Sequence, residues 1–161
     1  MDFKYTVTIK GSKDTIEFKP EETHSGNESI TGVQFGYRCK VDSFDRDKNG
    51  RTEIKIFGKL DDRPETFNAI KSLAEWSKEK DNVYREVTIV ATSKNQDSEG
   101  TGNFRRTYHF DKMFCVNYVE KSGIFAKDEN NEGSASLTFE VYLAQAPNYH
   151  ISETMSEIVN E

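Results

Sequence analysis

The most suggestive spacing of chemically active residues in this 161-residue sequence is Asp45-x-Asp47-x-Asn49-Gly50, which matches the start of a calcium-binding loop. Alternate side-chain oxygens can turn toward a hard cation, and the glycine permits the sharp bend that follows. The loop also needs a bidentate glutamate at its twelfth position, which here is Ile56. An Asn-Gly pair between two alternating segments is typical of a hairpin turn. Asp45, Asp47 and Asn49 are therefore weak candidate metal ligands, and the hairpin explains them better.

The histidines and cysteines form no recognisable catalytic or metal-binding motif. His24, His109 and His150 lie far apart, without the spacing of zinc ligands. Cys39 and Cys115 each lie among aromatic and β-branched neighbours, which favours two buried thiols over a disulfide or a redox pair. No serine lies in a Gly-x-Ser-x-Gly turn, and no glycine-rich loop leads from a strand into a helix. We expect no cofactor and no enzymatic activity; a hydrolase site assembled from distant residues is a weaker alternative.

Alternating apolar and polar residues predict the elements that would position these side chains, in a mainly β (α+β) fold. The expected strands cover residues 3–10, 15–18, 30–44, 52–57, 84–91, 106–110, 113–120 and 135–144. Gly32 and Gly36 lie inside the third of these, as is typical of a bend that curls a sheet. Asp111-Lys112 is expected to be a turn between two strands.

One amphipathic helix is expected after the fourth strand. Asp61 or Asp62 can cap its start, and Pro64 suits its first turn. Apolar side chains then recur at spacings of three and four, at Phe67, Ile70, Leu73, Ala74 and Trp76. The prediction is a single antiparallel β-barrel or sandwich, residues 1–146, with this helix packed on its side. Residues 147–161 are expected to form an acidic, flexible tail.

The composition indicates a folded domain that does not bind nucleic acid. Lys and Arg number 22 against 28 Asp and Glu, so the net charge is −6, and a phosphate backbone requires a concentrated positive surface. Only 34 % of residues are hydrophobic but 12 % are aromatic, so the core should consist largely of rings. No apolar run approaches the ~20 residues that span a membrane. No signal peptide is visible, so we expect assembly in the cytoplasm, with export by another route left open.

One segment of the second half resembles the tube proteins of contractile injection machines. In that family Arg-x-Tyr-x-Phe, a short polar turn and Phe-Val-Val-x-Tyr-x-Glu precede a final strand. The matching residues here are Arg106, Tyr108, Phe110, Phe114, Val116, Tyr118 and Glu120. Cys115 and Asn117 depart from the pattern, and the loops at 19–29 and 93–103 are longer than usual. The chain is thus similar, up to about Leu143, to the haemolysin-coregulated tube protein of type VI secretion and to contractile-phage tail-tube proteins.

The resemblance implies a structural subunit that closes into six-membered rings, which stack into a hollow tube. Neighbours would meet through head-to-tail surfaces, and exposed strand edges would extend each other's sheets. Sheath, spike or baseplate proteins and lumenal cargo would be further partners, and the machine would release the tube to the extracellular space.

Two sets of residues are predicted for such a subunit. Candidate subunit contacts are Asn27, Lys94, Asn103, Arg105, Arg106, Lys127 and Glu132. Candidate core anchors are Phe67, Ile70, Trp76, Tyr108, Phe110, Phe114 and Tyr118. The alternative function is a monomeric β-barrel or sandwich binding module, with calcium held by the Asp45–Asn49 loop.

Overall fold

The computed structural model describes residues 3–20, 29–39, 50–61, 63–81, 83–93, 104–124, 135–146 and 156–161. Within these ranges the elements are β1 (Phe3–Lys10), β2 (Thr15–Phe18), β3 (Ile30–Arg38), β4 (Arg51–Lys59), α2 (Pro64–Lys78), β5 (Arg85–Ser93), β6 (Phe104–Ile124), β7 (Ala135–Gln145) and β8 (Ser156–Asn160). The strands form one sheet in the order β2-β1-β5-β6-β7-β4-β3, and β8 also pairs with β6. Every ladder is antiparallel. The predicted fold class, mainly β with one helix, is confirmed.

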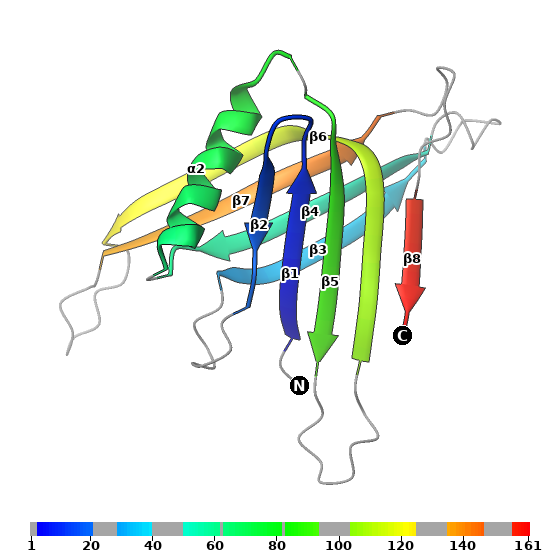
Figure 1. The fold of residues 1–161 in the computed structure, drawn as a ribbon, viewed down its shortest axis with the longest axis horizontal. Helices are drawn as coiled ribbons and strands as arrows, with labels where there is room; N and C mark the ends of the chain where they lie inside the picture. Colours follow the sequence, from blue (N-terminus) through cyan, green and yellow to red (C-terminus); the bar gives the residue numbers. More distant parts are fainter. Residues whose placement is uncertain are drawn as a thin grey trace, which may run out of the picture.

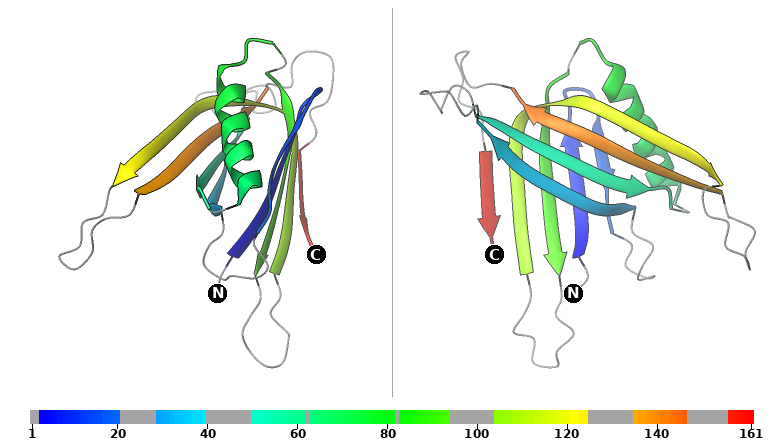
Figure 2. Two further views of the ribbon diagram at one scale, coloured as in Figure 1. Left: turned by 60° about the vertical axis from the view of Figure 1, so that its left-hand side comes forward. Right: turned by 180° about the vertical axis from the view of Figure 1, so that it is seen from behind.

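The sheet folds onto itself as two layers whose strands run across one another (Figures 1 and 2). We call the first layer β2, β1, β5, residues 104–110 of β6, and β8. The second layer consists of residues 114–124 of β6, followed by β7, β4 and β3. This is an orthogonal sandwich, in which a strand that bends at the corner belongs to both layers.

The corner lies in β6, which continues for 21 residues through the predicted turn at Asp111-Lys112. That turn prediction is wrong because pairing persists on both sides of it: Met113 is opposite Arg85 in β5 and Gln145 in β7. Lys112 absorbs the bend with a φ of 51°. Its carbonyl accepts a hydrogen bond from the Ala146 backbone N–H at 2.9 Å.

Aromatic rings join the two layers across the core. The expectation that the core consists largely of rings is wrong, because most of the buried hydrophobic side chains are aliphatic. Phe18 of β2 packs on Phe139 of β7, with ring centroids 5.5 Å apart. Phe35 of β3 stacks on Phe110 of β6 at 5.7 Å. The alternating aliphatic residues of the strands fill the space between, and Val7, Ile9, Val87, Ile89, Val141 and Leu143 are fully buried.

Helix α2 begins at Pro64, but the predicted Asp61 is not its N-cap, and Asp62 lies outside the described residues. The N-cap is Arg63, without a side-chain cap hydrogen bond. The buried Asp61 carboxylate instead accepts hydrogen bonds from the backbone N–H and the Nε of Arg63, both at 2.9 Å. The described part of the chain contains no helix long and apolar enough to span a membrane.

Phe67 is not a core anchor, since 58 % of it is exposed. The buried side chains of α2 are Thr66, Ala69, Ile70, Leu73 and Trp76. Successive helix residues are separated by about 100°, so Phe67 lies on the flank of that stripe. The sequence pattern misplaced the stripe because it gave no weight to Thr66, whose side chain donates a hydrogen bond to the buried Asp61 carboxylate.

The expectation of a flexible tail is wrong for its last described residues, which form β8. Residues 106–110 of β6 pair with residues 156–160. Arg106 Nε donates to Asn160 Oδ1 at 2.7 Å, and Arg105 Nε lies 2.9 Å from Glu161 Oε2. A strand can dock through backbone hydrogen bonds and ion pairs, so a segment poor in apolar residues need not stay unpaired.

Gly58→Ala is expected to lower the free energy of unfolding by about 1–3 kcal/mol, measured by urea denaturation. A Cβ atom there would overlap the Phe139 ring and lie 2.7 Å from the Ser29 carbonyl oxygen. Gly36→Ala is the matched control, because a Cβ at that strand glycine would meet nothing within 4 Å. Equal effects of the two substitutions would contradict a special role for Gly58.

Asp61 makes the free energy of unfolding depend on pH in the acidic range. Burial opposes ionisation of this carboxyl, but hydrogen bonds from Arg63 and Thr66 outweigh it and lower its pKa. The unfolded chain therefore binds the proton more tightly, so the stabilisation is present above the ordinary carboxyl pKa and is lost as pH falls through the lowered one. We expect Asp61→Asn to reduce the stability difference between about pH 6 and pH 2 in urea titrations. Glu75→Gln, at an exposed helix ion pair, should leave that difference unchanged.

Candidate functional site

The second layer ends in two long strand edges that have no partner within the described ranges. β3 pairs only with β4. Beyond Met113, β6 pairs only with β7. Unpaired backbone N–H and C=O groups on such edges are templates for a strand of another chain.

The β3 edge lacks the features that usually protect an edge strand from pairing. It is nine residues long and carries one charged residue, Arg38, at its end. Phe35 and Tyr37 are 37 % and 50 % exposed. Proteins usually shorten exposed edges, charge them, interrupt them with proline or twist them with a bulge. In β3 the charge is confined to Arg38 and the register irregularity to the first residues, between Ile30 and Gly32, so the edge between them is unprotected.

The second edge, residues 114–124 of β6, is also open along its length. Val116 and Val119 are 49 % and 38 % exposed. Tyr118 turns inward, where burial and a 2.6 Å hydrogen bond from its hydroxyl to Glu120 Oε1 raise its pKa. The remaining two edges, β2 and β8, are only four and five residues long and each carries a glutamate.

The residues predicted for metal binding and most predicted subunit contacts lie outside the described ranges. These are Asp45, Asp47 and Asn49 among the metal candidates, and Asn27, Lys94, Asn103, Lys127 and Glu132 among the contacts. Arg105 and Arg106 are described, and both hold β8 within the same chain. No group of three or more His, Cys, Asp or Glu suited to a metal ion occurs in the portions of the chain that the structure covers.

The predicted core anchors are buried to different degrees. Ile70, Trp76 and Phe110 are buried, whereas Tyr108, Phe114 and Tyr118 are half-buried. The half-buried rings still make contacts: Tyr108 with Phe35 at 5.6 Å, Phe114 with Tyr84 at 6.1 Å, and Tyr118 with Phe139 at 6.4 Å.

Cys115 and Cys39 are not joined in a disulfide, and both are half-buried rather than buried as predicted. Burial raises the pKa of Cys115 from 9.0 to about 11, although a hydrogen bond from the Asn117 backbone opposes the shift. Because only the thiolate is alkylated, we expect iodoacetamide to modify Cys115 about 100-fold more slowly than an ordinary thiol at pH 8. The rate would be measured in a Cys39→Ser variant. The same variant unfolded in urea is the control, and equal rates in the two states would contradict the prediction.

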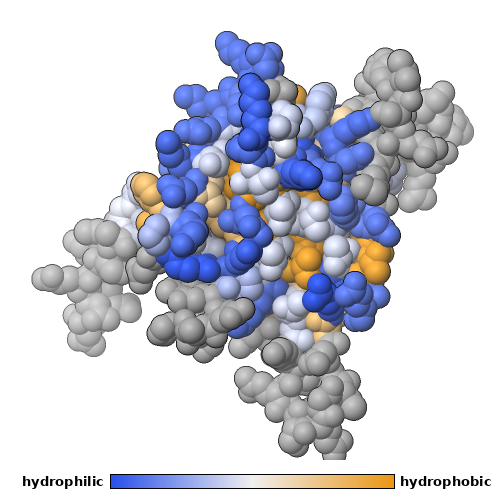
Figure 3. Space-filling view, in the orientation of Figure 1, coloured by the Kyte–Doolittle hydropathy of each residue, from blue (hydrophilic) through white to orange (hydrophobic). Residues whose placement is uncertain are grey.

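The resemblance implied that exposed strand edges would extend each other's sheets, but the sequence did not show which strands are edges, and most candidate contacts were placed in polar loops. The available signal in the sequence was the long alternating segment that forms β3, which carries a single charge at its end. On the face seen in Figure 3 the described surface is mostly hydrophilic, with separate hydrophobic groups near its centre and at its right-hand side. Association through this face would not rest on a large apolar patch.

Comparison with known proteins gives a likeness in fold. No protein-family model and no curated protein sequence matches the chain. A crystal structure of an Hcp protein aligns with a TM-score of 0.50 and 12 % identity over 100 % of both chains. The secreted protein Hcp3 from Pseudomonas aeruginosa aligns with a TM-score of 0.50 and 13 % identity over 97 % of each chain. At these identities the likeness shows a shared fold, and it agrees with the resemblance of the segment from Arg106 to Glu120.

Proposed function

We propose that the protein is a tube subunit of a contractile injection machine, which closes into homo-oligomeric rings that stack into a hollow tube. The observation that carries the proposal is the second layer, a four-stranded sheet with two long open edges. The Hcp-like fold and the tube-protein pattern between Arg106 and Glu120 support the same function.

The strand directions of the second layer suit head-to-tail pairing. Its order is β6-β7-β4-β3, and each neighbouring pair is antiparallel. With four alternating strands, β3 runs opposite to β6, so β3 of one copy would meet β6 of the next as an antiparallel pair. Such a heterologous contact forms a closed ring when its rotation divides the circle evenly. A ring of six copies is the number that the family resemblance implies.

The remaining parts of the function follow from that resemblance. The subunit would assemble in the cytoplasm and leave the cell as part of the ejected machine. Sheath, spike or baseplate proteins would contact the tube, and cargo would pass through its lumen. The role is structural, without catalysis.

Electron microscopy and light scattering of the purified protein would test the proposal. We expect rings of uniform diameter, tubes at higher concentration, and a mass that is a fixed multiple of 18.5 kDa. A protein that stays monomeric at the highest concentration, with neither rings nor tubes, would contradict it.

A further inference from the structure

The two edges of the first layer, β2 and β8, lie on opposite sides of the molecule. The line that joins them crosses the line that joins the second-layer edges, β3 and β6 (Figure 1). β2 ends the first layer on the side of α2, and β8 ends it on the other side (Figure 1). The strands of the two layers cross, so the β2 and β8 edges face directions different from those of β3 and β6.

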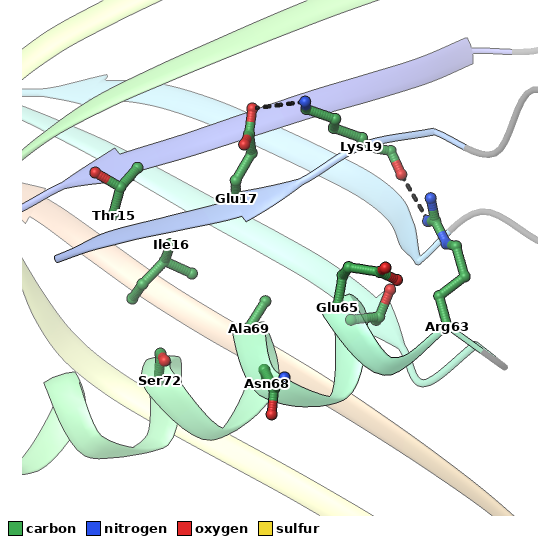
Figure 4. Close-up of a pocket in the computed structure, with 10 residues that line it drawn as sticks. Thr15, Ile16, Glu17, Lys19, Arg63, Glu65, Asn68, Ala69 and Ser72 are labelled. Carbon is green, nitrogen blue, oxygen red and sulfur yellow. Dashed lines mark hydrogen bonds and ion pairs between the residues drawn. The ribbon is translucent and has the colours of Figure 1, made fainter.

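A groove runs between β2 and α2, beside the open edge of β2 (Figure 4). Its volume is about 550 Å³. Asn68 and Ser72 line it from the helix, and Ile16 and Ala69 lie at its base. At one end Arg63 Nη2 donates a hydrogen bond to the Lys19 carbonyl oxygen at 2.6 Å. The groove thus presents polar side chains next to a strand whose backbone pairs on one side only, with β1.

β8, the edge strand on the opposite side of the first layer, is short enough to be a candidate occupant of such a groove. Its backbone pairs with β6, and no described strand lies on its other side. Ile158 and Val159 are 45 % and 37 % exposed, and Glu157 and Asn160 are exposed as well. The fold therefore leaves one edge of β8 and one edge of β2 open on opposite sides of each copy.

We propose that β8 of one subunit docks in the groove between β2 and α2 of a second copy, and that this contact stacks one ring on the next. The inference rests on the proposed ring, since it assigns the second-layer edges to ring closure. A head-to-tail contact in a different direction need not close, and it then repeats as a linear stack.

Strand direction and charge support this occupant. Four successive antiparallel ladders link β2 to β8, so the two strands run in the same direction. Stacked copies would bring them together in parallel, with Glu161 beyond the end of β8 near Lys19 beyond the end of β2. The Glu161 carboxylate, which lies 2.9 Å from Arg105 Nε within its own chain, would then be shared between Arg105 and Lys19. The Lys19 side chain is 65 % exposed, and its 3.5 Å ion pair with Glu17 leaves it able to reach a second carboxylate.

Cysteine cross-linking between copies tests the contact. Ser72→Cys in one preparation and Glu157→Cys in another, both in the Cys39→Ser background, would be mixed, assembled and oxidised. We expect at least about tenfold more disulfide-linked dimer than with Lys71→Cys in place of Ser72→Cys. Lys71 adjoins Ser72 but lies about 100° around α2 from it, on the solvent side of the helix, with its side chain 70 % exposed. Equal yields for the two mixtures would overturn the proposal.

A substitution that fills the groove provides the second test. Ser72→Trp should abolish tubes while leaving single rings visible in electron micrographs, and Lys71→Trp should leave both. Wild-type tubes without the 72–157 cross-link, or tubes that persist in Ser72→Trp, would overturn the docking contact but not ring formation. Wild-type protein that forms no rings would instead overturn the proposed function, and the docking contact with it.

Discussion

Trp76→Ala is expected to lower the free energy of unfolding by about 3–5 kcal/mol, because a large ring is removed from a site that cannot collapse completely. Trp76 is 2 % exposed. Its Nε1 donates a hydrogen bond to the Val83 carbonyl oxygen at 2.9 Å, which fixes the segment between α2 and β5. The Arg85 guanidinium lies 5.3 Å from the ring centroid.

Removal of the Trp76 ring would also weaken the contacts of Arg85, whose guanidinium packs against that ring. Arg85 is 4 % exposed, and its Nη2 lies 3.1 Å from Asp14 Oδ1 and 3.4 Å from Glu79 Oε1. The guanidinium thus joins the β1–β2 turn and the end of α2 across the face of Trp76. In Trp76→Ala, water entering the cavity beneath the guanidinium would weaken its ion pairs with Asp14 and Glu79, and its contact with the ring would be lost.

Urea denaturation of Trp76→Ala and Phe67→Ala measures this difference on one helix. Phe67 is 58 % exposed, so its removal should change the free energy of unfolding by no more than about 0.5 kcal/mol. Equal losses for the two variants would show that the core does not depend on the buried face of α2.

Like charges placed on both open edges of the second layer are expected to prevent ring formation. Gln34, Lys55, Tyr142 and Asn117 form one row across that layer, on the face opposite the core. Gln34 and Asn117 are the ends of the row, and a ring in which this row continues from one copy to the next would bring them side by side. The double variant Gln34→Lys, Asn117→Lys puts two positive charges at each junction.

The effect should be large because a ring contains one junction per subunit. Like charges on opposed strands cost about 0.2–1 kcal/mol per pair, so the six junctions of the proposed ring would add up to about 6 kcal/mol. The matched control is Gln34→Lys, Asn117→Glu, in which the new charges attract. Light scattering should show monomers for the first variant and rings for the second, with equal unfolding free energies. Rings in both would place the subunit contact elsewhere.

Local patterns predicted the elements of this fold well, since alternation and helical spacing are properties of neighbouring residues. β1 and β2 have the predicted bounds, and Pro64 starts α2. The errors arose where pairing with segments distant in the sequence determines whether a residue lies in a strand. Asp111-Lys112 has the composition of a turn, yet β5 and β7 keep it within one strand. Ser156–Asn160 has few apolar residues, yet the edge of β6 supplies it with a partner.

The candidate site was the least predictable part, because an open edge depends on which strands are absent beside it. Phe35 and Tyr37 alternate in the sequence as core residues would. Only the strand order shows that β3 is at the end of a layer, where these rings are left partly exposed. Phe67 is a similar case, since its exposure follows from how α2 is rotated against the sheet.

The continuity of β6 through Lys112 has a mechanical consequence. A tube that is driven forward must transmit thrust from ring to ring without its subunits coming apart. In this fold the first layer is proposed to stack the rings and the second layer to close them. Both layers contain part of β6, so force passes between them along one continuous backbone. Pulling the layers apart would require stripping β6 from β5 or from β7, and a ladder pulled along its strands must break many hydrogen bonds at once. The corner strand β6 would therefore carry the mechanical load between the two layers of the subunit.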